Sequence, residues 1–425
     1  MIETHRPRRL AAAGVSVALA LALAACAQEY PNTTFSPNTE FGRAIDELWN
    51  SLLFWGTVVF IVVSASLLFI LVRFRRRPGA PEPRQVHGNT ALEIAWTLIP
   101  AVILIFIAVP TVRTIFATQA RAPEDALTIE VIGHQWWWEF RYPEYGITTA
   151  NELYIPRGRA VNFELRTADV LHSFWIPQMG GKRDLISNRT NYLWFTPDSG
   201  DAAAWNGFCA EFCGESHANM RFRAFTVTPE QFEGWVALQQ APALFGAIAP
   251  AAPAPGTPAP GTPAAGTPAG QQPTAPVGHD PGVAVATAEY FVFPRDQVPA
   301  HIVPDVPIPR ALSFDASLTG DPERGRELYS RTACIGCHRI RGNPTSVGIT
   351  GPDLTHFGSR LTLGAGTFPN DPLPLALWIK NAPVMKPGAI MPPFGQGERD
   401  ARTGVTGYLT DQQIADIAAY LQALR

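Results

Sequence analysis

Cysteine is scarce in this sequence, and its placement excludes a disulfide framework. The 425 residues include five cysteines. Four of them form two close pairs, Cys209 with Cys213 and Cys334 with Cys337, and Cys26 stands alone. A secreted domain held together by disulfides would spread its bridges over long loops. Close cysteine pairs beside a histidine are instead typical of metal or haem sites, so both pairs are candidate sites.

Excess charge is also missing. The formal net charge is -3, and a nearly neutral chain lacks the basic surface that binds nucleic acid. Charged residues are absent from 241–278, where GTPA occurs three times. Such an Ala/Pro/Gly/Thr sequence cannot bury enough apolar surface to fold. We therefore expect no nucleic-acid partner. We also expect a Pro-rich linker over residues 241–313, whose last part wraps around its neighbours.

Two apolar stretches carry no charge at all, residues 51–72 and 94–112. A bilayer core of ~30 Å needs about 20 apolar residues, so each stretch is long enough to span it. The segment between them, RFRRRPGAPEPR, contains a cluster of arginines, which the positive-inside rule places in the cytoplasm. The sequence predicts a transmembrane hairpin over 48–116 in a bacterial cytoplasmic membrane. Both termini and the rest of the chain would then be extracytoplasmic.

The first 25 residues have the composition of an export signal. Three arginines precede an apolar run over 10–25, which is too short and too rich in alanine to span a bilayer comfortably. The sequence LAAC at 23–26 resembles a bacterial lipobox, which would make Cys26 a lipidated N-terminus. The alternative is an ordinary signal peptide cleaved nearby, with Cys26 incidental.

Beyond the membrane the sequence predicts two different folds. Over residues 120–240, short alternating runs such as AVNFELRT and RFRAFTV predict strands of a β-sandwich or barrel. TPEQFEGWVALQQ predicts a closing helix over 228–240. Over 314–425 the patterns are helical, from DPERGRELYSRTACIGCH to LTDQQIADIAAYLQAL. The fold class is thus a multi-domain membrane protein with a two-helix hairpin, an all-β domain, a linker and an all-α domain.

The sequence CIGCH begins at Cys334 and is the CxxCH motif of covalent c-type haem attachment. Cys334 and Cys337 would form thioethers with the porphyrin, and His338 would bind the iron. A second axial ligand from methionine raises the reduction potential relative to bis-histidine ligation. Two methionines lie downstream, Met385 and Met391.

The helical domain resembles class I cytochrome c. In that family the axial methionine lies in a Pro-flanked loop, which favours Met391, in PGAIMPPF, over Met385. The segment GPDL resembles the part of the family in which a proline stands behind the axial histidine, here Pro352. We expect His356 at the surface or near the haem propionates, and not as a ligand.

The segment CAEFCGESHANM, residues 209–220, concentrates two cysteines, a histidine and a methionine. Structural zinc sites rarely use a thioether, whereas soft sulfur ligands with imidazole suit copper. A blue-copper site uses a single cysteine, so a second one indicates a second metal ion bridged by both sulfurs. A disulfide between Cys209 and Cys213 is the alternative, but it would leave the histidine and the methionine unexplained.

The pattern CxExCGxxHxxM resembles the dinuclear copper A site of cytochrome c oxidase subunit II. The similarity extends from the hairpin to about Trp235, and the appended haem domain resembles that of caa3-type oxidases. The resemblance implies a cupredoxin barrel and a second histidine in DVLHSFWIPQMGGKRD. The implied copper A ligands are His172, Cys209, Glu211 through its carbonyl, Cys213, His217 and Met220.

The same resemblance implies three further roles. The Glu211 carboxylate would help to bind magnesium at the boundary with subunit I. Trp136, in GHQWWWEF, would be the aromatic residue through which electrons enter, and Glu93 would mark the mouth of a proton channel. Consecutive strand residues point to opposite faces, so at most Trp136 and Trp138 share a side. Trp137 and Trp138 are expected to pack or to lie at the membrane interface, and His134 to be structural.

The predicted function is that of the electron-accepting subunit of a cytochrome c oxidase. Cytochrome c or another donor would reduce haem c, and electrons would pass through copper A to a haem–copper subunit that reduces dioxygen with proton translocation. The predicted spans contain no histidine, so the oxygen chemistry belongs to the partner subunit. The alternatives are the equivalent subunit of a copper A nitric oxide reductase and a copper-handling assembly lipoprotein. A quinol oxidase subunit would lack the copper ligands.

Overall fold

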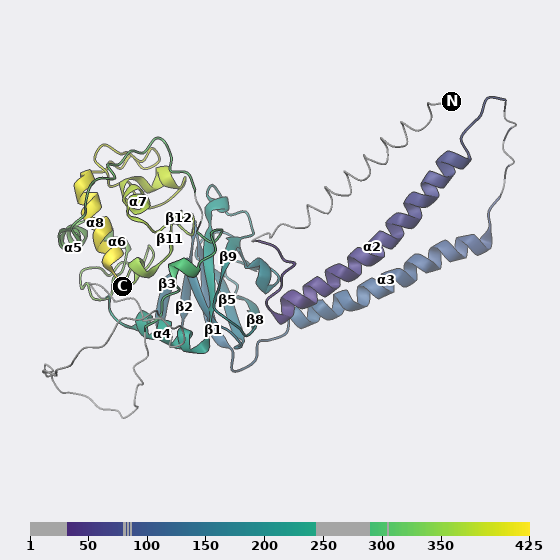
Figure 1. The fold of residues 1–425 in the computed structure, drawn as a ribbon, viewed down its shortest axis with the longest axis horizontal. Coiled ribbons are helices and arrows are strands. Elements are labelled where there is room, and N and C mark those ends of the chain that lie inside the picture. Colours follow the sequence, from purple (N-terminus) through teal and green to yellow (C-terminus); the bar gives the residue numbers. More distant parts are fainter. Residues whose placement is uncertain (1–31, 80–81, 83–84, 86, 244–289, 304–305) are drawn as a thin grey trace, which may run out of the picture.

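The computed structural model describes residues 32–79, 82, 85, 87–243, 290–303 and 306–425. The predicted export signal, Cys26 and most of the predicted linker lie outside the described residues. The described chain forms a helical hairpin, a β domain and a mainly helical C-terminal domain, which lies against the β domain (Figure 1). This arrangement confirms the predicted fold class.

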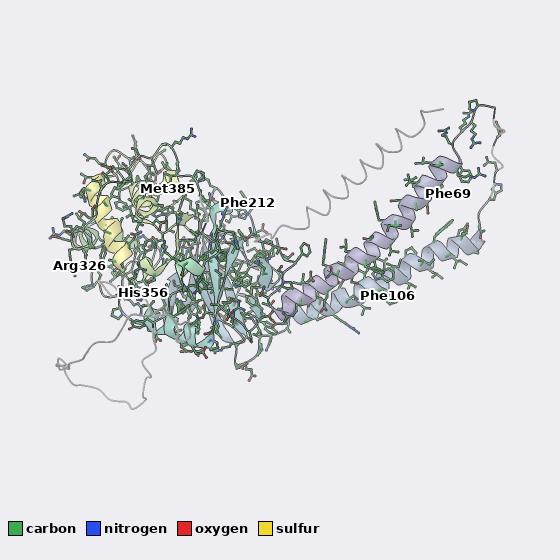
Figure 2. The ribbon with its side chains drawn as sticks, in the orientation of Figure 1. Phe69, Phe106, Phe212, Arg326, His356 and Met385 are labelled. Atoms are coloured by element: carbon green, nitrogen blue, oxygen red, sulfur yellow. The ribbon has the colours of Figure 1, made fainter. Side chains whose placement is uncertain are left out.

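Two long helices form the hairpin, α2 (Glu40–Arg73) and α3 (Thr90–Thr118). Both are long and apolar enough to cross a membrane, as are no other helices among the described residues. α2 begins before the predicted span because the Thr39 side chain caps it, accepting a hydrogen bond from the Gly42 amide. Phe69 and Phe106 point outward from the two helices (Figure 2) and are 61% and 57% exposed. Such apolar outward faces suit a lipid environment.

The β domain contains two five-stranded sheets, in the strand orders β3-β2-β1-β5-β8 and β4-β10-β9-β6-β7. Side chains alternate between core and surface along β1, as its apolar-polar pattern requires. Between the sheets the rings of Trp138, Phe174 and Phe222 pack edge to face or stacked. The strands are β1 (Leu127–His134), β2 (Trp137–Tyr142), β3 (Ile147–Ala150), β4 (Glu152–Pro156), β5 (Val161–Thr167), β6 (His172–Trp175), β7 (Arg183–Leu185), β8 (Asn191–Phe195), β9 (Ala203–Cys209) and β10 (Arg221–Val227).

One local expectation was wrong. GHQWWWEF is not a continuous strand, because β1 ends at His134 and β2 begins at Trp137, so Trp136 lies in a tight turn. Because Trp136 is not a strand residue, the alternation of side chains along a strand does not predict which way its side chain points. Trp138 is fully buried in the core, as expected. His134 stacks on Trp137 with ring centroids 4.1 Å apart, and its imidazole pairs with Glu139, which agrees with a structural role.

A closing helix, α4 (Pro229–Gln240), follows β10 with Thr228 as its cap. The chain is described again from residue 290. There the segment 290–303 packs onto the β domain, where Phe293 and Ile302 join the core and are 2% and 0% exposed. The ring of Phe293 lies 4.9 Å from that of Phe225 in β10. The wrapping part of the predicted linker is thus a structural component of the β domain.

The C-terminal domain is built on the helices α5 (Pro322–Arg331), α6 (Cys334–Cys337), α7 (Pro372–Met385) and α8 (Asp411–Ala423). α5 and α8 cross in close contact, since a Cβ atom at Gly325 would lie 1.9 Å from the Asp416 carbonyl oxygen. Arg324 pairs with the buried Asp416 carboxylate at 3.0 Å across the same crossing. A short hairpin, β11 (Thr362–Leu363) and β12 (Phe368–Pro369), projects toward the β domain (Figure 1). Short 3-10 turns complete the fold: η1 (Pro177–Met179), η2 (His217–Asn219), η3 (Arg295–Gln297) and η4 (Phe357–Ser359).

We predict that Phe293→Ala lowers the free energy of unfolding of the β domain by about 3–5 kcal/mol, the usual cost of deleting a buried phenylalanine ring. Thermal unfolding of the full-length chain in detergent would show a lower melting temperature. Tyr290→Ala is the control, because Tyr290 is 39% exposed. Equal stability of the two variants would contradict the packing of this segment into the core.

Candidate functional site

The five side chains of the predicted copper site come from separate elements at one end of the β domain. His172 begins β6 and Cys209 ends β9, and these two strands pair with Phe174 opposite Cys209. Cys213 lies in the loop after β9. His217 begins η2, and Met220 lies between η2 and β10. The pairing of β6 with β9 brings His172 to residues that follow it by almost forty positions.

The sulfur and imidazole atoms of these residues converge. The Sγ atoms of Cys209 and Cys213 lie 3.7 Å apart, and both thiols are free, so no disulfide joins them. His172 Nδ1 lies 3.8 Å from the Cys209 sulfur, and His217 Nδ1 lies 3.6 Å from the Cys213 sulfur. The Met220 thioether is 3.8 Å from the Cys213 sulfur. Each cysteine thus has one imidazole beside it.

The loop between the cysteines adds an oxygen atom. The Glu211 carbonyl oxygen lies 3.2 Å from the Cys209 sulfur, so it faces the same space as the other groups. The Glu211 side chain itself is half-buried. Beside it Phe212 is 75% exposed at the rim of the domain (Figure 2). Two thiols, two imidazoles, a thioether and a carbonyl form a donor set that suits copper.

Asp169 orients His172 and was missed by the sequence analysis. Its carboxylate lies 2.8 Å from His172 Nε2, which leaves Nδ1 directed at the cysteines. A carboxylate on the far nitrogen commonly fixes the orientation of a metal-binding histidine. Burial lowers the pKa of His172, but the hydrogen bonds with Asp169 and Cys209 outweigh that effect and raise it. The only signal in the sequence is an aspartate three positions before the histidine, in DVLH.

The two thiols cannot both ionise easily without a cation. The hydrogen bond from Cys213 holds the pKa of the Cys209 thiol far below its usual range, and His172 adds to that effect. The same hydrogen bond and burial raise the pKa of Cys213, with the Cys209 charge as a further cause. Thiolates are the forms that bind metals. A site that holds two thiolates this close therefore fits positively charged metal ions bound between them.

The C-terminal domain contains an apolar cavity of about 250 Å³ lined by Cys334, Cys337, His338 and Met391. His338 Nδ1 lies 2.8 Å from the Pro352 carbonyl oxygen, so Nε2 is the nitrogen left to bind iron. Burial lowers the pKa of His338, which keeps the imidazole neutral as a ligand must be. The cavity, the two thiols and the histidine together fit a covalently bound haem.

The two candidate methionines lie in different surroundings. Met391 is half-buried and lines the cavity. Met385 ends α7, is 5% exposed and packs among the apolar core residues of the domain. Of these two methionines, Met391 therefore lines the cavity and Met385 does not.

The surface position expected for His356 is wrong. His356 is 3% exposed and lies at the boundary between the two domains (Figure 2). Its Nε2 lies 3.1 Å from the Ala241 carbonyl oxygen, because residues 241–243 run over this part of the C-terminal domain. Burial lowers the pKa of His356 to about 4. It does not line the haem cavity.

Trp136 lies between the two candidate sites. Its indole Nε1 donates a hydrogen bond of 3.0 Å to the Cys213 carbonyl oxygen, and the Gln135 amide donates to the same oxygen at 2.8 Å. The opposite part of the indole meets the C-terminal domain, since a Cβ atom at Gly388 would lie 2.4 Å from the Trp136 ring. Trp136 also lines the haem cavity. One side chain therefore contacts the cysteine loop and the cavity.

Two contacts that the sequence analysis missed join the domains around Trp136. Lys386, which is 3% exposed, donates to the Trp136 carbonyl oxygen at 2.6 Å. Burial lowers the pKa of Lys386 to about 7. The Ser216 hydroxyl donates to the Pro387 carbonyl oxygen. Nothing in the local sequence pattern marks either residue, because each partner lies more than a hundred positions away.

Glu93 lies apart from these sites. It is exposed in the first turn of α3, at the end of the hairpin that is remote from the β domain (Figure 1). The arginines that follow α2 are at this same end. Glu93 is therefore at one end of the second span.

Comparison with known families accounts for these three parts of the chain. Residues 32–114 match the transmembrane domain of cytochrome c oxidase subunit II, and residues 146–224 match its periplasmic domain. Residues 322–425 match cytochrome c. The cytochrome c oxidase subunit 2 of Alkalihalophilus pseudofirmus is 30% identical over 405 residues, which cover 94% of this chain and 96% of that protein. The chain belongs to the cytochrome c oxidase subunit II family.

It is a subunit II with a cytochrome c domain fused at its C-terminus, as the motifs predicted. The cytochrome c oxidase subunit 2 of Bacillus sp. PS3 is 30% identical over 83% of this chain and 80% of its own length. The quinol oxidase subunit 2 of Bacillus spizizenii is 37% identical over 44% of this chain and 61% of its own length.

Membership of the family settles the broad role. The chain is a subunit of an oxidoreductase, through which electrons enter a haem–copper oxidase. It is a membrane protein with two spans, and a subunit II works with subunit I in a membrane complex. The cytochrome c domain indicates haem c, and the periplasmic domain indicates copper A.

We predict that Met391 ligates the haem iron and that Met391→Leu, which lacks the thioether, lowers the haem reduction potential. The measurement is a redox titration of the haem in the purified complex, with the sulfur-to-iron charge-transfer band as a second readout. Met385→Leu is the matched control, because this volume-conserving change in the core costs under about 1.5 kcal/mol and leaves the ligands in place. The assignment is wrong if Met385→Leu, and not Met391→Leu, loses the band.

Proposed function

We propose that this subunit receives electrons at haem c and passes them through a dinuclear copper A site to the haem–copper subunit that reduces dioxygen. The observation that carries the proposal is the position of Trp136. It contacts the Cys213 carbonyl through its indole nitrogen and lines the haem cavity with its ring. An aromatic residue that joins the two sites shortens the gap that an electron must cross.

The proposal assigns separate residues of this chain to the haem and to copper A. Cys334 and Cys337 would attach the haem, and His338 and Met391 would bind its iron. The residues that would hold copper A are His172, Cys209, Glu211 through its carbonyl, Cys213, His217 and Met220. When bound, the two cofactors supply one-electron chemistry that the side chains cannot. Cys209, Cys213, His172 and Met220 are buried, and strand pairing holds the segments that carry them.

A fused donor also has a kinetic advantage. A diffusing cytochrome must collide with the copper domain, whereas the C-terminal domain is already seated on it. Covalent linkage makes the encounter intramolecular, and the contacts of Lys386 and Ser216 fix its geometry. The external donor, cytochrome c or another carrier, then reacts with the haem domain.

The proposal also covers the orientation in the membrane and the roles of Glu93, Glu211 and Cys26. The arginines at the end of α2 support a cytoplasmic loop between the helices, and both cofactor domains would then face outward from a bacterial cytoplasmic membrane. Glu93 would then lie at the cytoplasmic mouth of the second span and pass protons toward subunit I. The half-buried Glu211 carboxylate would help to bind magnesium at the subunit I boundary. Cys26 would carry a lipid anchor.

A copper A nitric oxide reductase subunit is the second candidate, because it would use the same two sites. A copper-handling lipoprotein would need exchangeable, exposed ligands. Here His172 and Met220 are 0% and 1% exposed, which argues against metal delivery.

Gas consumption by the detergent-solubilised native complex tests the proposal. With ascorbate and a redox dye as reductant, we expect fast oxygen uptake and little nitric oxide turnover. Rapid nitric oxide turnover with negligible oxygen uptake would keep both metal sites and overturn the oxidase assignment.

We predict that Trp136→Phe slows electron transfer from haem c to copper A several-fold, because it removes the hydrogen bond to the Cys213 carbonyl. Stopped-flow reduction would resolve the two steps by their absorption bands, and metal content would stay unchanged. Trp205→Phe is the matched control, since its indole donates to Thr226 within the β domain. An unchanged transfer rate in Trp136→Phe would assign this residue to packing.

A further inference from the structure

The turn of the β11–β12 hairpin has an unusual backbone. Three consecutive residues, Gly364, Ala365 and Gly366, have φ values of +64°, +63° and +68°. Glycine adopts this left-handed region freely, but an alanine there is uncommon and costs energy. Such a conformation persists only where the surrounding contacts hold it. The three residues lie at the point where the C-terminal domain meets the β domain (Figure 1).

The turn presents its three carbonyl groups to three donors. The Gly364 oxygen accepts from Lys386 at 3.1 Å. The Ala365 oxygen accepts from the backbone amide of Arg221 at 3.1 Å. The Gly366 oxygen accepts from the Arg223 guanidinium at 2.7 Å. The two arginines belong to β10, so the turn is bonded directly to a strand of the copper domain.

A fourth contact comes from the residue after the turn. The Thr367 hydroxyl shares its single proton between the Gly364 carbonyl oxygen of the turn at 2.9 Å and the Asn219 carbonyl oxygen at 3.3 Å. The hairpin therefore holds the copper domain at Asn219 and at Arg221, which are the residues on either side of Met220. Met220 is 1% exposed, and its own carbonyl accepts from the Cys209 amide at 3.0 Å. The backbone that carries the thioether is held on one side by its own domain and on both flanks by the haem domain.

Two buried ionisable side chains add contacts at this boundary. Arg223 and Glu152 lie opposite each other on the paired strands β10 and β4 and are 1% and 3% exposed. The Glu152 carboxylate accepts from the amides of Leu361 and Thr362, at 2.7 and 3.0 Å, at the start of the hairpin. Without the hairpin, Arg223 would lose its bond to the Gly366 carbonyl oxygen, and Glu152 would lose its bonds to the Leu361 and Thr362 amides. A buried charged group that loses its hydrogen-bond partners is strongly destabilising, so these contacts favour the docked arrangement.

We propose that the β11–β12 hairpin of the haem domain positions Met220 at the copper site by holding Asn219 and Arg221. This inference rests on the proposed copper site. It assigns the hairpin a role beyond docking, because the cytochrome domain then completes the copper centre of the neighbouring domain as well as supplying its electrons. The hairpin residues are positioning residues, which act on copper through the Met220 backbone.

The experiment alters the hairpin in the full-length complex and measures the copper itself. In Gly366→Ala a new Cβ atom would lie 2.9 Å from the Arg223 guanidinium, which pushes the turn away from β10. Thr367→Val removes the hydroxyl contacts with Asn219 and with Gly364 of the turn, with little change in volume. Gly397→Ala is the matched control, because Gly397 has φ +82° and has no atom within 4 Å of its added Cβ. The readouts are the electron paramagnetic resonance spectrum and reduction potential of copper A, copper content, and the haem absorption spectrum.

We expect Gly366→Ala and Thr367→Val to shift the copper spectrum and potential while copper content and the haem spectrum stay unchanged. Gly397→Ala should match the unaltered complex in every readout. An unaltered copper spectrum and potential in Thr367→Val, with copper bound, would overturn the proposal even if Gly366→Ala fails to accumulate. Absence of a mixed-valence copper spectrum from the unaltered complex would instead refute the copper site of the proposed function, and this inference with it.

Discussion

Two cysteine sulfur atoms held 3.7 Å apart are the constraint on which the copper end of this molecule depends. Two thiolates at that distance repel each other strongly in a buried site, where charges are poorly screened. An imidazole lies beside each sulfur, and the Asp169 carboxylate lies against the far nitrogen of His172. The strands β6, β9 and β10 and the turns that carry these groups must therefore meet at one end of the β domain. The pairing of β6 with β9 and of β9 with β10 satisfies that requirement.

The boundary between the two cofactor domains is built from the same elements. β10 follows Met220 and carries Arg223 into contact with the haem domain, and β4 carries Glu152 to the same hairpin. On the other side of the boundary, the loop from Lys386 to Met391 reaches Trp136 before it turns to the haem cavity. The segments that carry the candidate copper and haem residues are therefore also the segments that hold the domains together.

Much of the architecture was predictable because its signals are local. The two apolar spans, the alternating strands and the CIGCH motif each depend on neighbours within about twenty positions. The preference for Met391 over Met385 came from a Pro-flanked loop, and Met391 is the one of the two that lines the cavity. Trp136 was assigned the wrong local structure, because an alternating pattern does not reveal a turn between two strands. His356 was misplaced because the segment that covers it, residues 241–243, belongs to another part of the chain.

The sequence by itself determined which chemistry this protein can hold. The spacing in CAEFCGESHANM and the CxxCH motif specify soft copper ligands and a covalent haem, and side-chain chemistry is a property of residues and their immediate neighbours. Only the tertiary structure decided how the two sites meet. Trp136 spans 77 positions to reach Cys213, and Lys386 spans 250 positions to reach Trp136. Contacts between residues so far apart arise from strand pairing and domain docking, and neither of these can be read from local sequence spacing.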